Sequence, residues 1–188
     1  MDDRKRRLFV GIALDERTRE ACAAASQQLQ KTGFAAKYEA REKLHVTLAF
    51  LGHVSVHRYA EIVSALSAAA CGAPFTVTLD KLGGFPHERR PRVVYVGARE
   101  QGAPFRALAA RVRDAYAALG FAFKNDAVAH VTIARVKAPS RALPLIEFAP
   151  ITLRIEALTL FESLPDHANG TSRYEALERA ACSGAGLP

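Results

Sequence analysis

The hexapeptide His-Val-Thr-Leu-Ala-Phe occupies residues 45–50, and His-Val-Thr-Ile-Ala-Arg occupies residues 130–135. In an extended strand, residues i and i+2 project to the same face. His45 and Thr47 therefore point together, as do His130 and Thr132, while the residues between them are apolar, as a core face requires. The pattern predicts two half-buried strands that each present an imidazole and a hydroxyl.

The sequence around the hexapeptides is repeated as well. Residues 9–11 (Phe-Val-Gly) match residues 95–97 (Tyr-Val-Gly), and the Gly-Phe-Ala of residues 33–35 recurs at 120–122. The aromatic residue precedes the histidine by 36 residues in one half and by 35 in the other. Matched anchors in the same order indicate an internal duplication. We therefore expect one bilobal α+β domain spanning residues 1–188, with duplicated units at about 7–52 and 92–136 and a cleft on a pseudo-two-fold axis.

Apolar periodicity, helix caps and turn residues predict the elements of each half. We expect helices at 16–31 (with Asp15 as the N-cap), around 62–70 and at 103–119. Strands are expected at 7–14, 44–51, 74–82, 93–97, 128–136, 148–162 (with an interruption) and 173–177. The basic run Arg4–Arg7 is expected to be a solvated, partly ordered tail.

Composition is typical of a folded soluble domain, with 49% hydrophobic and 24% charged residues. The net charge of +7 suits an anionic partner such as nucleic acid or phosphate, but many small basic proteins share it. Three cysteines without a CxxC pair disfavour a disulfide framework or a thiolate zinc site, and they fit a reducing compartment. Apolar runs fall short of the roughly 20 residues of a membrane span. We therefore expect a cytoplasmic protein with no membrane association.

Two imidazoles and two hydroxyls that share a cleft suit phosphodiester cleavage without a metal. A neutral histidine can deprotonate a nucleophile while a protonated one supplies a proton to the leaving oxygen. Threonine hydroxyls can donate to phosphate oxygens, and Arg135 adds a cation with fork geometry. Phe50 and Arg135 follow their histidines by five residues, however, so strict alternation turns them to the other face. Each needs a bulge to reach the cleft.

Other readings of these residues are weaker. A single His-x-Thr on a strand often marks a histidine bonded to backbone, and Phe50 can be a core residue. Catalytic zinc needs three protein ligands, yet neither HxH nor HExxH occurs, and His53 and His57 form the only candidate pair. The sequence also lacks a GxSxG elbow and a GxxxxGK[ST] loop. The duplication favours a functional role for both His-x-Thr triplets.

The paired motifs resemble those of the 2H phosphoesterases, and more narrowly those of the RNA 2′,3′-cyclic phosphodiesterases, also called 2′-5′ RNA ligases. Nearly the whole chain takes part: RLFVGIAL, KLHVTLAFLG, LGGFPHERRPRVVYVG, AHVTIARV and LTLFES…RYEAL match in order and spacing. One departure is Ala129, where the family often has proline before the second motif. The resemblance implies lobes of antiparallel sheet with outer helices, and no metal or other cofactor.

The activity implied by the resemblance is the opening of a 2′,3′-cyclic phosphate at an RNA 3′ end to leave a 2′-phosphomonoester. By motif, His45 would be the proton donor and His130 the proton acceptor. The near-symmetry of the halves does not distinguish these roles. The substrate-binding residues implied are Thr47, Thr132 and Arg135 for the phosphate and Phe50 for a base.

Three alternatives stay open from the sequence. The chain could catalyse the reverse 2′-5′ RNA ligation, or hydrolyse other cyclic or 2′-5′-linked nucleotides. From a different class, it could be a non-catalytic module that binds RNA ends. The expected partners are RNA with 2′,3′-cyclic phosphate ends or cyclic nucleotides, and the chain is expected to be a monomer.

Overall fold

The computed structural model describes residues 4–70, 72–138, 140–166 and 171–183. Its helices are α1 (Glu16–Lys31), α2 (Tyr59–Ala68) and α3 (Gly102–Ala117), with 3-10 turns η1 (Arg41–Lys43) and η2 (Val56–Arg58). The strands are β1 (Lys5–Ala13), β2 (Lys37–Tyr38), β3 (His45–Ser55), β4 (Phe75–Leu79), β5 (Lys81–Phe85), β6 (Val93–Gly97), β7 (His130–Arg135), β8 (Ile151–Ile155), β9 (Ala157–Asp166) and β10 (Thr171–Ala181). As predicted, the Asp15 carboxylate caps α1, accepting a hydrogen bond from the backbone N–H of Thr18 at 2.7 Å.

The main sheet is antiparallel and symmetric about its centre. Its order is β10-β9-β1-β3-β7-β6-β5, with β2 also pairing with β7. In this order β3 corresponds to β7, β1 to β6 and β9 to β5. Strands β10 and β2 have no counterpart in the other half. Val46 pairs with Val131, its counterpart in the other hexapeptide. The pseudo-two-fold axis therefore passes between the two His-Val-Thr strands.

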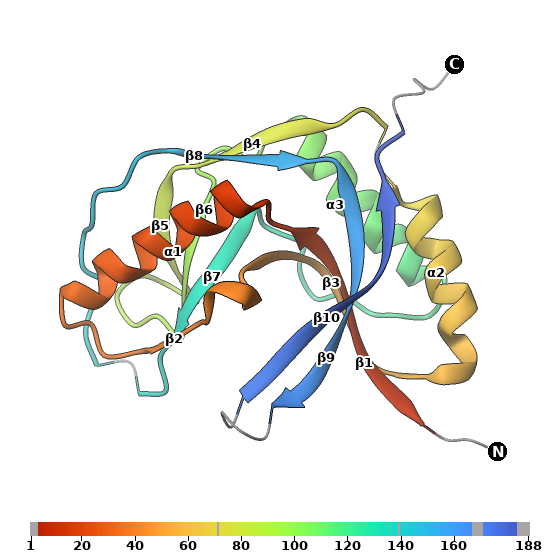
Figure 1. Cartoon of the computed structure of the whole chain (residues 1–188), viewed down its shortest axis with the longest axis horizontal. Coiled ribbons are helices and arrows are strands. Elements are labelled where there is room, and N and C mark those ends of the chain that lie inside the picture. The colour runs from red at the N-terminus through yellow and green to blue at the C-terminus, as the bar shows by residue number, and fades with distance from the viewer. Residues whose placement is uncertain (1–3, 71, 139, 167–170, 184–188) are drawn as a thin grey trace.

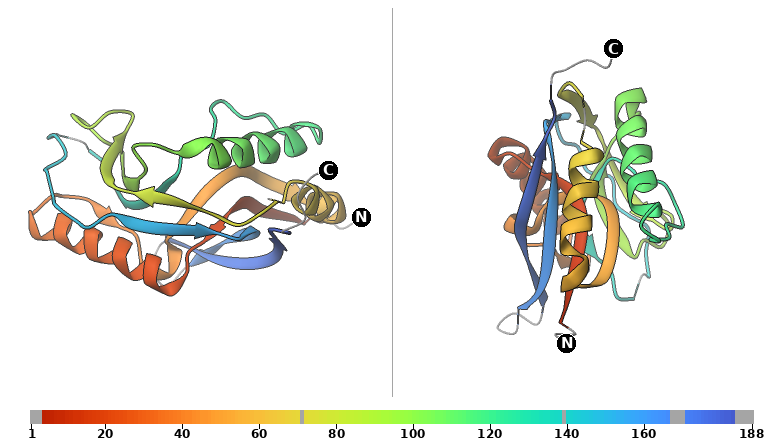
Figure 2. Two further views of the ribbon diagram at one scale, coloured as in Figure 1. Left: turned by 90° about the horizontal axis from the view of Figure 1, so that it is seen from above. Right: turned by 90° about the vertical axis from the view of Figure 1, so that its right-hand side faces the viewer.

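A second, two-stranded sheet lies on the same axis. Strands β4 and β8 pair antiparallel around Val77 and Leu153, and they run side by side across the molecule (Figure 1). Helix α1 follows β1 in the chain but contacts β7 and β8, whereas α3 follows β6 but contacts β3 and β4. Figure 2 shows these two helices on opposite sides of the strands. Each half thus covers strands of the other, which confirms the α+β fold with outer helices.

Two sequence expectations need correction. The strand expected at 74–82 is two strands, β4 and β5, and β5 continues through its glycines to Phe85. A Cβ on Gly83 would lie 2.4 Å from the Tyr95 ring, so the aromatic side chain occupies the space over this strand. The basic run Arg4–Arg7 was expected to be a solvated tail, but β1 already begins at Lys5. Arg6 forms an ion pair with Glu162 at 2.5 Å. Short β2 and the turns η1 and η2 carry no apolar periodicity and were not predicted.

The cysteines also depart from expectation. Cys22 is a free thiol on the buried face of α1, and burial raises its pKa to about 12. Cys182, however, is disulfide-bonded, so the expectation against disulfides was wrong at this position. Cys71 lies outside the described residues. None of the helices in the described ranges is both long and apolar enough to cross a membrane.

The repeated glycines bring the neighbouring strands close to the His-Val-Thr strands. A Cβ on Gly11 would lie 2.4 Å from the carbonyl oxygen of Val46, and one on Gly97 would lie 3.0 Å from that of Ala129. Gly11 faces backbone, which cannot move aside as a flexible side chain can, whereas a Cβ on Gly97 would first meet the Tyr95 ring at 2.9 Å. Gly11 is therefore required by packing against β3, the strand that carries His45.

Candidate active site

A β-bulge in each His-Val-Thr strand turns the sixth residue of the hexapeptide toward the histidine. In β3, Thr47 pairs with Gly11 and Ala49 pairs with Val10, which leaves Leu48 as the extra residue. In β7, Thr132 pairs with Tyr95 and Ala134 with Val94, so the bulge falls at the equivalent position, residue 133. An extra residue reverses the alternation after it. Position six therefore returns to the face of the histidine and threonine in both strands.

The two strands line one cavity of about 130 Å³ at the centre of the sheet. The sequence-predicted residues that line it are His45, Thr47, Phe50, Thr132 and Arg135. Phe50 keeps half of its surface exposed, at 50%, although it is a large apolar side chain. It is available to contact a ligand and is not a core residue.

His130 lies beside this cavity, two residues before Thr132 on the same face of β7. It is not itself among the side chains that line the cavity. The antiparallel pairing of Val46 with Val131 places His130 across from Thr47 and His45 across from Thr132. The structure therefore brings the two His-Val-Thr segments side by side, with His45 in the cavity and His130 next to it.

Each imidazole is held by the backbone in the same way. Nδ1 of His45 donates to the carbonyl oxygen of Lys43 at 2.6 Å, and Nδ1 of His130 donates to that of Val128 at 2.8 Å. Both carbonyls belong to the residue two positions before the histidine. A carbonyl can only accept, so it fixes the proton on Nδ1 and leaves Nε2 as the nitrogen that gains or loses a proton. Nε2 of His45 lies 2.9 Å from the Thr47 hydroxyl oxygen.

Aromatic rings surround each imidazole, and in each half a stacked pair of rings lies against it. The Phe9 ring lies 4.9 Å from His45 and stacks on Phe161, while the Tyr95 ring lies 5.2 Å from His130 and stacks on Phe85. Tyr174 of β10 adds an edge contact to His45 at 5.1 Å between centroids. These rings exclude water from the imidazoles and fix their orientation.

The cleft lowers the pKa of both histidines. Burial is the main cause in each case, because it disfavours the charged imidazolium. The backbone carbonyls oppose this effect at both sites, and Glu39 also opposes it at His45. The guanidinium of Arg135 lowers the pKa of both imidazoles further. Neutral imidazoles are therefore favoured in the free protein, and a bound anion would shift both toward the protonated form.

Glu39 organises the cations of the cleft and was missed from the sequence. It lies just after β2, outside any periodic segment, and pairs with Nζ of Lys43 at 3.0 Å and with Nε of Arg135 at 2.8 Å. Burial acts to raise the pKa of this carboxyl, but its hydrogen bonds and ion pairs with the two cations outweigh that effect and hold the pKa below its ordinary value. The bond at Nε leaves the Nη groups of Arg135 for a ligand.

Other lining residues were also missed. Arg7 was assigned to a tail, and Lys43, Ser163 and Tyr174 belong to no repeated motif, yet all four line the cavity. Arg7, Lys43 and Arg135 outnumber Glu39, the acidic residue of the lining. The cavity is thus suited to an anion, and within the described residues no group of three His, Cys, Asp or Glu side chains is placed to hold a metal ion.

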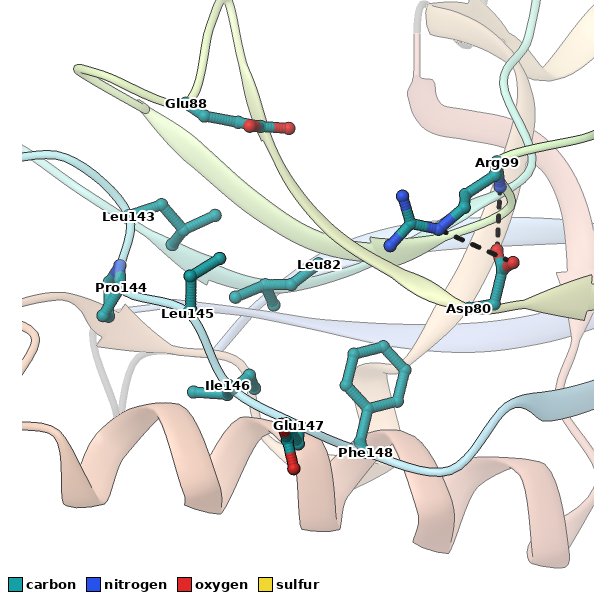
Figure 3. A pocket seen from close by; sticks show the side chains of 10 residues that line it. All are labelled: Asp80, Leu82, Glu88, Arg99, Leu143, Pro144, Leu145, Ile146, Glu147 and Phe148. Carbon is teal, nitrogen blue, oxygen red and sulfur yellow. Dashed lines mark hydrogen bonds and ion pairs between the residues drawn. The ribbon is translucent and has the colours of Figure 1, made fainter.

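A larger cavity, of about 430 Å³, lies between β5 and the segment Leu143–Phe148 (Figure 3). Its polar side chains Asp80 and Arg99 bond to each other, with the backbone N–H of Arg99 donating to Asp80 at 2.9 Å. Its other charged lining residues are Glu88 and Glu147, so acidic groups outnumber its one cation, and histidine is absent from the lining. The smaller cavity between β3 and β7 is therefore the candidate active site.

Comparison with known proteins gives a consistent result. Residues 18–167 match the family model of the 2′-5′ RNA ligase superfamily. The chain is 32% identical over 162 residues to an RNA 2′,3′-cyclic phosphodiesterase of Thermotoga maritima, covering 84% of this chain and 86% of that protein. It is 37% identical over 131 residues to one of Archaeoglobus fulgidus, covering 70% and 73%.

A solved structure shares both fold and sequence. Escherichia coli LigT complexed with 3′-AMP aligns with a TM-score of 0.74 at 27% identity, covering 95% of this chain and 99% of that one. The fold is therefore shared with a protein whose structure was solved in complex with a nucleotide.

Proposed function

The chain belongs to the 2′-5′ RNA ligase superfamily, and on that premise we propose that it hydrolyses RNA 2′,3′-cyclic phosphate ends to 2′-phosphomonoesters without a metal ion. The names of its relatives support a cyclic phosphodiesterase. The observation that carries the two-histidine mechanism is the matched pair of imidazoles. Each has Nδ1 bonded to a backbone carbonyl. His45 lines the cation-rich cavity, and the pairing of Val46 with Val131 places His130 next to it.

In the proposed reaction, water attacks the cyclic phosphorus as the bond to the ribose 3′ oxygen breaks. Nε2 of neutral His130 accepts the proton of the attacking water, and Nε2–H of protonated His45 supplies a proton to the departing 3′ oxygen. One proton is taken up and one is released, so the next turnover requires the two histidines to exchange a proton with solvent. Because the same residues can act in reverse, 2′-5′ ligation would use the same site.

The remaining lining residues are assigned to binding. We assign the hydroxyls of Thr47 and Thr132 and the Nη groups of Arg135 to the non-bridging phosphate oxygens, where negative charge must be held. Phe50 offers an exposed ring on the same face, suited to stacking a base. A module that only bound RNA ends would have no use for two orientated Nε2 atoms, so catalysis explains the site better.

The direct test is incubation with adenosine 2′,3′-cyclic monophosphate in excess EDTA, followed by separation of the 2′- and 3′-phosphate products. We expect turnover that EDTA leaves unchanged and a 2′-phosphate product. Loss of activity in EDTA would contradict the metal-free mechanism. A 3′-phosphate product would reverse the assigned leaving group, and no turnover would favour the RNA-end-binding alternative.

The pH profile follows from the lowered pKa values of both histidines. The ratio kcat/KM reports ionisations of the free enzyme, so we expect a bell whose alkaline limb begins at or below about pH 6.5, the ordinary histidine value. Above that pH the acid is deprotonated, and below the lower pKa the base is protonated. The kcat profile should extend to higher pH, because bound phosphate favours the imidazolium. A kcat/KM profile that stays flat from pH 6 to 8 would contradict this assignment.

A further inference from the structure

A second groove lies next to the active-site cavity on the side of β1. Its polar lining is provided by Lys5, Arg7, His53, Glu162, Ser163, Thr171 and Ser172. Arg7 and Ser163 line both the groove and the cavity, and the Arg7 guanidinium donates to the Ser163 hydroxyl at 3.4 Å. The two hollows are therefore neighbours that share part of one wall.

The groove exists because two neighbouring strands separate. Pairing between β1 and β9 runs from Gly11 to Leu8 and stops there. Beyond that point β1 continues toward the N-terminus with β3, while β9 continues with β10, and Figure 1 shows the strands diverging. The groove lies where these strands separate, and its lining residues come from β1, β3, β9 and β10.

Basic residues face the groove because of strand parity. Lys5 and Arg7 alternate with the core residue Leu8 and share the face of Phe9, whose ring contacts His45. A second register shift in β3, between the partners of Leu8 and Phe9, brings His53 opposite Arg7. The Arg7 guanidinium also lies 5.0 Å from the centroid of the Phe50 ring. One row of side chains thus leads from the reacting centre, past the exposed aromatic ring, to exposed basic groups.

The acidic residue in the lining does not cancel this charge. Glu162 is buried, and its carboxylate accepts hydrogen bonds from Nε and Nη2 of Arg6 at 2.9 and 2.5 Å. Arg6 neutralises it. The positions equivalent to Lys5 and Arg7 in the other half are Pro91 and Val93, which carry no charge. Lys5 and Arg7 therefore make the β1 side of the cleft more basic than these equivalent positions on the β6 side.

We propose that this groove binds the RNA strand on the 5′ side of the reacting end, with Lys5, Arg7 and His53 contacting the phosphate that joins the terminal nucleotide to the preceding one. This inference rests on the proposed function, because it assigns the cyclic phosphate to the two histidines. It makes an oligoribonucleotide, and not a mononucleotide, the preferred substrate. Cationic grooves of this kind follow single strands through their backbone phosphates.

The test compares adenosine 2′,3′-cyclic monophosphate with a tetra-adenylate that ends in the same cyclic phosphate. We expect wild-type kcat/KM to be higher for the tetranucleotide and to fall more steeply with salt, by about 0.7 in the log–log slope per phosphate contact. The Lys5→Gln/His53→Gln variant should lose about tenfold on the tetranucleotide, at the low end of electrostatic attraction in charged clefts. Its rate on the mononucleotide should be unchanged, since neither residue lines the catalytic cavity.

A matched control removes the same chemical groups elsewhere. Lys31 at the end of α1 and His87 after β5 are both exposed, and Lys31→Gln/His87→Gln should keep the tetranucleotide preference. Equal wild-type rates and salt slopes on the two substrates would overturn the proposal. So would an equal loss in the control, or a loss by the groove variant on both substrates. If the wild type turns over neither substrate, the proposed function itself fails.

Discussion

Replacement of either His45 or His130 with alanine is expected to lower kcat by about 10² to 10⁴, the range for loss of a general acid or base. Each imidazole is already orientated by a backbone carbonyl, so removing it takes away a positioned Nε2. The double variant should lose much less than the product of the two factors, because the residues act as a unit. Single-turnover rates on adenosine 2′,3′-cyclic monophosphate measure this.

A second substrate separates the two roles. A nitrophenyl phosphodiester has a leaving oxygen that needs no proton, so the variant that lacks the acid should recover much of its activity on it. The variant that lacks the base should not. Recovery by His130→Ala in place of His45→Ala would exchange the assigned roles. A thermal unfolding curve for each variant controls for folding, and near-wild-type kcat in either would leave that histidine with a structural role.

Replacement of Thr47 or Thr132 with valine is expected to lower kcat by about 10² to 10³, as for loss of one hydrogen-bond donor to a developing negative charge. Valine keeps the shape and the strand preference of threonine but removes the hydroxyl. Both residues line the cavity, and Thr47 also bonds to Nε2 of His45. Thr47→Val should therefore also shift the pH profile, while Thr132→Val should lower the maximum rate without shifting the profile.

Two further variants make this measurement specific. Thr78 lies on the exposed face of β4, outside the cavity, so Thr78→Val should keep wild-type kcat. Serine restores a hydroxyl, so Thr47→Ser and Thr132→Ser should recover most of the rate. If the valine variants raised KM with kcat unchanged, the hydroxyls would contribute equally to ground-state and transition-state binding.

Much of the fold could be predicted because its signals are local. The strand at 93–97 and the helix ending at Lys31 follow from apolar periodicity and from a cap within a few residues. The end of β5 beyond Leu82 was missed because glycines are typical of a loop, and the ring that covers Gly83 comes from Tyr95 on the neighbouring strand. That contact is not visible in the local sequence.

The site, like the fold, could be predicted only in part. His-x-Thr at matched positions of a repeat predicted that His45 and His130 would share a cleft. Glu39 carried no such signal, since its role depends on an ion pair with Arg135, 96 residues away in the chain. Arg7 belonged to a basic run at the N-terminus, and it is the pairing of β1 with β3 that places it beside Phe50.

The sequence alone determined the duplication and the two imidazole–hydroxyl pairs, because alternation along a strand is a property of neighbouring residues. The tertiary structure decided whether Phe50 and Arg135 face the cleft. Leu48 and Ile133 are apolar and buried. Their identities therefore do not show from the sequence whether the alternation of faces continues through them or is reversed by a bulge. Pairing with strands from elsewhere in the chain makes them bulges. A shift of register moves every later side chain to the other face, and register is set between strands.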